Sequence, residues 1–298
     1  MARLALSTLF LVIPGALRGQ TPEEIGATIK YVRSLQAENG GFRPRSVEAA
    51  AKEPNPPSLR AAVGALRVVK YLEGEIKDVS GCKKFVAGCF DKETGGFADA
   101  PGGKPDVVTT AIGLMALVEL RIPVDDYRDP ALAYLSKHAN SFEEIRMAAA
   151  GAEAAGKQPP AAKTWIRRIA DMRAADGLYG KGDGQARQTG SSVVAILRLG
   201  GELENAKEVL AALKAGQRKD GGFGKAETTN SDLETSYRVM RAFHMIKGQP
   251  TDVSALKGFM ARCRNKDGGY GVTPGQQSTV SGTYFAAIIR HWLEKPMQ

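Results

Sequence analysis

The chain has 298 residues, of which 43% are hydrophobic and 24% are charged, and it contains three cysteines. This composition excludes a long disordered protein, and three cysteines are too few for a scaffold held by disulfides. The formal net charge is +9, but the lysines and arginines form no dense cluster, so we expect no nucleic-acid partner.

The first residues have the pattern of a signal peptide. Arg3 provides a basic start, an apolar run extends from Leu4 to Ile13, and small residues stand at Ala16 and Gly19. The run is too short for a stable membrane span, and no later stretch is long and uncharged enough for one. We expect a signal peptide over 1–19, cleaved after Ala16 or Gly19, and a secreted or periplasmic protein. A buried N-terminal helix is the alternative.

A short phrase of a polar residue, glycine and an aromatic recurs along the rest of the chain. It reads NGGF, TGGF, DGLY, DGGF and DGGY, with aromatics at Phe42, Phe97, Tyr179, Phe223 and Tyr270. The step from Phe97 to Tyr179 is nearly twice each of the two steps that follow. This spacing indicates that one unit lost its phrase near residues 138–142, and it predicts six repeats in all.

Two kinds of helix are predicted around these phrases. Segments before a phrase, such as 21–36, 160–175 and 202–216, alternate apolar and charged residues with helical spacing. Segments after a phrase, such as 105–120, 188–199 and 278–293, are apolar or small nearly all round, which predicts burial on every side. We therefore expect an all-α fold over residues 20–298, an α6/α6 toroid of six helical hairpins with an apolar inner ring.

The glycines of the phrase have a conformational role. Asp or Asn followed by two glycines turns the chain sharply, through positive φ angles that glycine adopts without strain. We expect such angles among Gly40, Gly95, Gly221 and Gly268, where alanine would cost on the order of 1 kcal/mol.

The three cysteines leave the disulfide pattern open. Cys82 and Cys89 lie on one predicted helix about 10 Å apart, beyond the reach of a disulfide between them. Either of them could pair with Cys263, but both could not.

The stretch FDKETGGFADAPGGKPDVVTTAIGLMALVEL, residues 90–120, resembles the repeat of the prenyltransferase β subunit and squalene cyclase superfamily. It is most similar to protein geranylgeranyltransferase β subunits, and the resemblance spans roughly residues 21–293. It implies a toroid whose inner helices surround an apolar cavity for an isoprenoid chain.

The zinc ligands of that family are missing here. Where the resemblance places an Asp and a Cys, this chain has Asp232 and Glu234, and where it places a His, the chain has Thr109 or Gly282. Without thiolate or imidazole ligands we expect no zinc, and we assign no metal or cofactor. Asp232 and Glu234 could hold a hard cation, but acids that favour the helix dipole are the preferred interpretation. A cyclase would need an acidic run, but Asp125 and Asp126 follow a proline and are expected in a loop.

The candidate site residues are those that begin an inner helix or closely follow its start. We expect them near the mouth or wall of the cavity, with no catalytic residue assigned: Asp106, Thr109, Asp232, Glu234, Tyr237 and Tyr284.

The expected function is that of an exported toroid, similar to prenyltransferases or terpene cyclases, whose cavity takes an isoprenoid-like or other hydrophobic ligand. Partners are a hydrophobic small molecule or a peptide. Whether the protein is an enzyme stays open; if so, it would be a prenyltransferase-like transferase or a terpenoid cyclase. The alternatives are a glycan-active α/α-barrel hydrolase or lyase, which requires paired carboxylates, and a non-catalytic peptide-binding scaffold.

Overall fold

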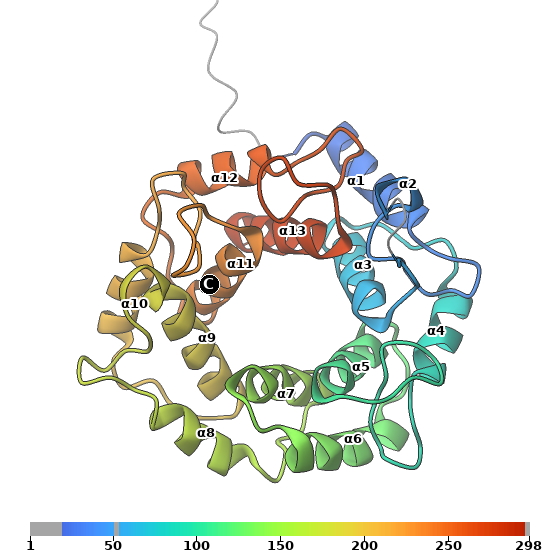
Figure 1. The fold of residues 1–298 in the computed structure, drawn as a ribbon, viewed down its shortest axis with the longest axis horizontal. Coiled ribbons are helices and arrows are strands. Elements are labelled where there is room, and N and C mark those ends of the chain that lie inside the picture. Colours follow the sequence, from blue (N-terminus) through green and yellow to red (C-terminus); the bar gives the residue numbers. More distant parts are fainter. Residues whose placement is uncertain (1–19, 51–53, 296–298) are drawn as a thin grey trace, which may run out of the picture.

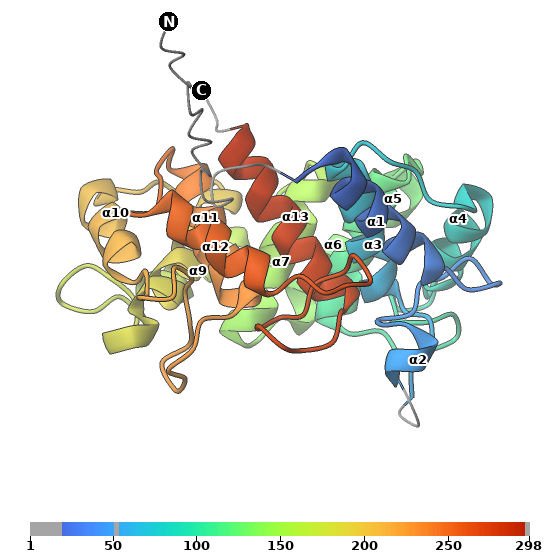
Figure 2. The ribbon, with the colours of Figure 1, turned by 90° about the horizontal axis from the view of Figure 1, so that it is seen from above.

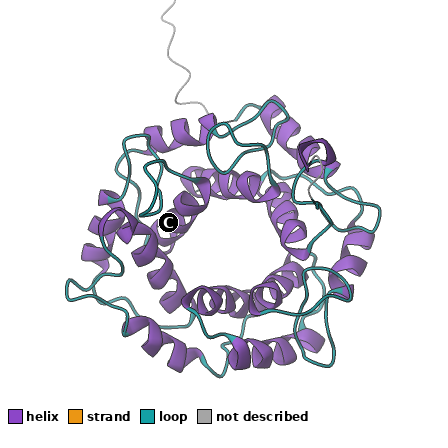
Figure 3. Cartoon of the chain, viewed as in Figure 1, coloured by secondary structure: helices purple, strands orange, loops and turns teal. Residues whose placement is uncertain are grey.

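The computed structural model describes residues 20–50 and 54–295. Within them the chain folds into two concentric rings of α-helices (Figures 1 and 3). This arrangement confirms the expected all-α toroid. The signal peptide expected over 1–19 lies outside the described residues.

The inner ring consists of the helices that follow the glycine-aromatic phrases and their equivalents. Its members are α3 (Leu59–Tyr71), α5 (Val107–Glu119), α7 (Phe142–Ala155), α9 (Gln185–Arg198), α11 (Leu233–Met245) and α13 (Val280–Glu294). Each inner helix packs against the next, and α13 packs against α3, so the last helix closes the ring on the first.

The outer ring alternates with the inner one along the chain. Its members are α1 (Pro22–Ser34), α4 (Val79–Gly88), α6 (Asp125–His138), α8 (Ala162–Ala170), α10 (Ala206–Ala215) and α12 (Val253–Arg262). Two short helices, α2 (Val47–Ala50) and η1 (Gly182–Gly184), lie in the connections. The alternation fits six hairpins, and the long connections lie on one face of the ring (Figure 2).

Equivalent hydrogen bonds tie the phrase to the inner helix that follows it. The backbone N–H groups of Phe97, Phe223 and Tyr270 donate to the hydroxyls of Thr110, Ser236 and Thr283, at 2.9, 3.0 and 3.0 Å. All three aromatic rings are almost completely buried. Because a buried N–H without a partner is costly, the hydroxyl fixes each aromatic in the gap between neighbouring hairpins.

The glycine prediction is confirmed. Gly40, Gly95, Gly221 and Gly268 have φ angles of 83°, 78°, 91° and 88°. Each Cα also lies close to an outer helix of the following unit, and that of Gly268 lies close to Ala27 on the first helix. The glycines therefore serve the contact between units as well as the turn, which the sequence pattern did not indicate.

Two further expectations meet a different outcome. Cys82, Cys89 and Cys263 are all buried and none forms a disulfide, so neither Cys82 nor Cys89 pairs with Cys263. Asp125 and Asp126 are not in a loop, because they form the first turn of α6, where acidic side chains favour the helix dipole. In the described part of the chain, no helix has the length and hydrophobicity required to cross a membrane.

Candidate functional site

A cavity of about 520 Å³ lies inside the inner ring, and all six inner helices contribute to its wall. Its volume is in the range of small-molecule sites, roughly 300 to 1,000 Å³. Part of the wall is apolar and aromatic, as the inner-helix pattern predicted. This part includes Val63, Ile112, Met115, Met147 and Phe285.

The rest of the wall is charged, which the expectation of an apolar cavity with a few acidic residues near its mouth did not include. The charged residues are Arg60, Arg67, Arg146, Arg198, Arg238, Arg241, Glu119, Glu143, Glu153 and Glu234. The guanidinium of Arg60, at the start of α3, pairs with Asp99 and Asp106 at 3.4 and 3.3 Å. Charges inside a ring of apolar helices are costly unless they are paired. The ion pairs of these residues therefore show which charges remain available to a ligand.

Near the N-terminal ends of α7 and α11, opposite charges are matched. Arg238 donates to Glu143 at 2.6 Å and to Glu234 at 2.7 Å, and Arg146 pairs with Glu143 at 2.9 Å. Burial would raise the pKa of Glu143, but the hydrogen bond from Arg238 and the charge of Arg146 lower it to about 2. The two carboxylates at this end are therefore ionised at neutral pH and already hold guanidinium partners.

Toward the C-terminal ends of the inner helices the wall has three arginines but only two glutamates to pair with them. Arg67 pairs with Glu119 at 2.9 Å, and Arg198 pairs with Glu153 at 2.9 Å. Arg241 has no carboxylate within ion-pair distance among the described residues, unlike the other arginines of the wall.

Aromatic side chains hold Arg241 in place. Its guanidinium carbon lies 4.4 Å from the centre of the Trp292 ring, and one of its nitrogens is 3.5 Å from the hydroxyl of Tyr237. Tyr237 in turn stacks on Phe285 and on Trp292, with ring centres 5.0 and 5.8 Å apart. The side chain of Arg241 is thus fixed by cation–π and stacking contacts that leave its charge without an anion.

Two tyrosines connect Arg241 to Arg67. The Tyr284 hydroxyl donates to that of Tyr237 at 3.4 Å and accepts from Arg67 at 3.2 Å. Burial would raise the pKa of Tyr237, but the charges of Arg241 and Arg198 outweigh it and lower this pKa to about 7. Burial and the neighbouring phenol raise the pKa of Tyr284. This end of the cavity therefore stabilises negative charge on an oxygen.

Of the six candidate residues, Glu234, Tyr237 and Tyr284 line the cavity, and the structure brings the two tyrosines together. Asp106, Thr109 and Asp232 do not line it. Ligand binding by the three lining residues stays a prediction.

The three other candidates stabilise the starts of inner helices. Asp106 caps α5 by accepting from the N–H of Thr109 at 2.7 Å, and Asp232 caps α11 by accepting from the N–H of Thr235 at 2.7 Å. The Thr109 hydroxyl donates to the carbonyl oxygen of Phe97 at 2.6 Å. These capping contacts explain why Asp and Thr occupy these positions, and no bound ligand is needed to explain them.

The surroundings of Glu234 are cationic. Besides Arg238, its carboxylate lies 3.4 Å from Arg187 and 3.8 Å from Lys225. These cations compete with a metal ion for the carboxylate oxygens. Among the described residues, no group of three or more His, Cys, Asp or Glu side chains is placed to hold a metal. The expectation that zinc does not bind stays a prediction.

The arginines of the wall were not among the residues predicted from the sequence. Arg67, Arg198 and Arg241 come from α3, α9 and α11, which are far apart in the chain. A signal was present, because a single arginine in an otherwise apolar inner segment such as SSVVAILRL has no polar helix face to lie on.

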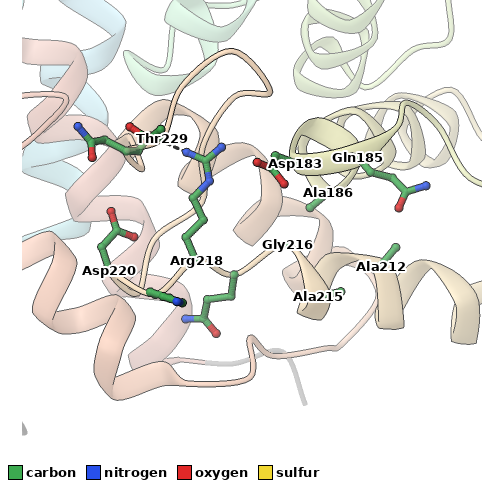
Figure 4. Close-up of a pocket in the computed structure, with 13 residues that line it drawn as sticks. Asp183, Gln185, Ala186, Ala212, Ala215, Gly216, Arg218, Asp220 and Thr229 are labelled. Atoms are coloured by element: carbon green, nitrogen blue, oxygen red, sulfur yellow. Dashed lines mark hydrogen bonds between the residues drawn. The ribbon is translucent and has the colours of Figure 1, made fainter.

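A second pocket, of about 620 Å³, lies in the outer layer beside α10 (Figure 4). Two of its charged side chains have partners: Arg218 donates to the carbonyl oxygen of Asn230 at 2.8 Å, and Asp220 accepts from Ser231 at 2.6 Å. Small side chains such as Ala212 and Ala215 form much of the remainder. Its other charged side chains, Asp183 and Lys219, are exposed, so this pocket lacks the apolar wall with a buried charge that distinguishes the central cavity.

Comparison with protein families finds a match to the prenyltransferase alpha-alpha toroid domain over residues 62–150 and 126–295. Together these ranges include well over half of the chain. No curated protein sequence matches.

Solved structures share the fold. Candida albicans protein geranylgeranyltransferase-I complexed with GGPP is similar over 91% of this chain and 92% of that chain, with a TM-score of 0.70 and 14% identity. A type II terpene cyclase from Scytonema in complex with geranylgeranyl dihydroxybenzoate is similar over 91% and 95%, with a TM-score of 0.61 and 11% identity. A protein from Actinoplanes is similar over 90% and 97%, with a TM-score of 0.57 and 12% identity. At these identities the likeness shows the fold alone.

Proposed function

The chain belongs to the prenyltransferase alpha-alpha toroid domain family, and from this premise we propose that its central cavity binds an isoprenoid-like molecule with a polar head group. The observation that carries the proposal is a single cavity whose wall combines apolar side chains with guanidinium groups. An isoprenoid chain would contact Ile112, Met147 and Phe285, and the head group would contact an arginine. The proposal concerns binding and assigns no catalytic residue.

Relatives of the same fold support this class of ligand. One is complexed with GGPP, and another holds geranylgeranyl dihydroxybenzoate, in which a geranylgeranyl chain is joined to an aromatic acid. A uniformly apolar molecule would displace water from Arg241, which has no carboxylate partner among the described residues, and give it no anion in return; this is costly. An amphipathic ligand matches both parts of the wall.

We expect the Met147→Trp variant to bind geranylgeraniol at least about tenfold more weakly than the natural protein, because Met147 lines the cavity and the larger indole would take up space that the chain needs. The loss of contacts with an apolar chain accounts for this size of effect. Isothermal titration calorimetry measures it. The control is Met172→Trp, at an outer position with 43% exposure, where binding should not change. Absence of binding to the natural protein, or an equal affinity of the two variants, would contradict the proposal.

We propose in addition that the protein is exported. The support is the basic start, apolar run and small residues of positions 1–19. N-terminal sequencing of the mature protein should give a start after Ala16 or Gly19, and a mature protein that retains Met1 would oppose export.

A further inference from the structure

The two ends of the cavity differ in charge balance. Toward the N-terminal ends of α7 and α11, Arg146 and Arg238 are matched by Glu143 and Glu234. At the other end three arginines, Arg67, Arg198 and Arg241, face two glutamates, and each glutamate already pairs with one of the other two arginines. One guanidinium charge is left over, and it belongs to Arg241.

We propose that Arg241 binds the carboxylate of an isoprenoid acid, so that the ligand's head group lies toward the C-terminal ends of the inner helices. This inference rests on the proposed function and narrows its ligand to a carboxylic acid. The Tyr237 hydroxyl lies 3.5 Å from a nitrogen of Arg241 and accepts from Tyr284, so its own proton can be donated to a carboxylate oxygen.

The geometry of Arg241 suits an ion pair with a ligand. Its buried Nε has no hydrogen-bond partner among the described residues. Its stacking on Trp292 fixes the plane of the guanidinium before a ligand arrives, which reduces the entropy lost on binding. A planar guanidinium with free N–H groups matches the two oxygens of a carboxylate.

The number of unpaired guanidinium groups in the cavity wall favours a carboxylate ligand over a diphosphate ligand. A carboxylate carries one negative charge and would balance the single unpaired guanidinium. A diphosphate carries more than one charge, and it could be neutralised here only if Arg67 or Arg198 released Glu119 or Glu153. Separating Arg67 from Glu119 is costly because the Glu119 side chain is only 9% exposed, although Lys70 would remain beside it at 2.8 Å. Separating Arg198 from Glu153 would leave a buried guanidinium without its carboxylate.

Three probes with the same chain and different head groups test the proposal: geranylgeranoic acid, geranylgeraniol and geranylgeranyl diphosphate. By calorimetry, the acid should bind at least about tenfold more tightly than the alcohol and the diphosphate, the size expected for one charged hydrogen-bonded pair. The Arg241→Gln variant should lose this preference, while Arg241→Lys should keep part of it. The alcohol should bind the natural protein and Arg241→Gln equally.

A control separates this effect from a general loss of positive charge. Arg187→Gln removes a guanidinium that pairs with Glu234 and does not line the cavity, so the preference for the acid should persist. Equal binding of the acid and the alcohol to the natural protein, tighter binding of the diphosphate, or an acid preference that survives in Arg241→Gln would overturn the proposal. Failure of all three probes to bind would instead refute the proposed function.

The pH dependence of binding gives a second readout. The titratable or charged groups that interact with Tyr237 are Arg67, Tyr71, Arg146, Arg198, Arg241 and Tyr284, and Glu119 and Glu153 line the same cavity from α5 and α7. The charges of Arg241 and Arg198 hold the pKa of Tyr237 below its ordinary value, and once Tyr237 loses its proton, its phenolate neutralises Arg241 and competes with a carboxylate. Affinity for the acid should therefore fall as the pH rises through this titration, and affinity for the alcohol should not. In Tyr237→Phe the fall should disappear; a fall of equal size in that variant would count against the site.

Discussion

The Gly221→Ala variant is expected to be less stable than the natural protein by about 2 to 5 kcal/mol. Gly221 has a φ angle of 91°, which an alanine adopts only with strain. An added Cβ would also lie 2.1 Å from the carbonyl oxygen of Ala255 and 2.3 Å from its carbonyl carbon, in α12. Because these are backbone atoms of the neighbouring hairpin, the clash can be relieved only by separating the two units. Denaturant unfolding measures the change.

A matched control isolates the contact between units from the strain of the turn. Gly275 has a φ angle of 82°, but an added Cβ there would have no atom within 4 Å. Gly275→Ala should therefore lose only the conformational contribution, about 1 to 2 kcal/mol. Equal destabilisation by the two substitutions would show that the phrase glycines serve the turn alone.

The Gly113→Ala variant is expected to be destabilised by about 2 kcal/mol, although helix propensity alone favours alanine by about 1 kcal/mol. Gly113 lies in the middle of α5, and an added Cβ would lie 2.3 Å from a carbon of the Phe97 ring. This ring is completely buried in the gap between hairpins and has no room to move. Glycine is therefore required here so that the aromatic of the phrase can contact the helix directly.

The control for Gly113 is Gly26, in the interior of α1. A Cβ at Gly26 would have no atom within 4 Å, so Gly26→Ala should raise the stability by about 0.5 to 1 kcal/mol. Thermal or denaturant unfolding should show that Gly113→Ala lowers the stability of the protein and that Gly26→Ala raises it. Stabilisation by both substitutions would mean that Phe97 can shift, and the packing argument would fail.

Much of the fold was predictable from the sequence because residues close together in the chain determine the turns and helices of each repeat. The order of polar residue, glycine and aromatic encodes a turn with positive φ, and the segments on either side differ in whether they have a polar face. Predicted and observed helices agree within a few residues, for example 105–120 against Val107–Glu119. The missing phrase near 138–142 corresponds to the short connection between α6 and α7.

The site was only partly predictable. Tyr237 and Tyr284 follow the starts of their helices at equivalent distances, so sequence position placed them near the cavity. Asp106 and Asp232 occupy helix starts too, but a carboxylate at that position serves equally as a cap or as a ligand, and only the structure shows the cap.

The charge of the cavity depends on closure of the ring. Arg67, Arg198 and Arg241 each belong to a different repeat, and each would be an ordinary solvent-exposed arginine on an isolated hairpin. Only when α13 packs against α3 do six inner helices enclose one space and bring these groups together. A pattern read along one repeat at a time could not show which arginine would lack a carboxylate.

The most direct test of the proposed binding site is a crystal structure of the protein with geranylgeranoic acid. We expect the isoprenoid chain inside the inner ring, against Ile112, Met147 and Phe285, with the carboxylate within hydrogen-bond distance of Arg241. A ligand bound outside the ring, or a chain inside it with the carboxylate beside Arg146 and Arg238, would contradict it.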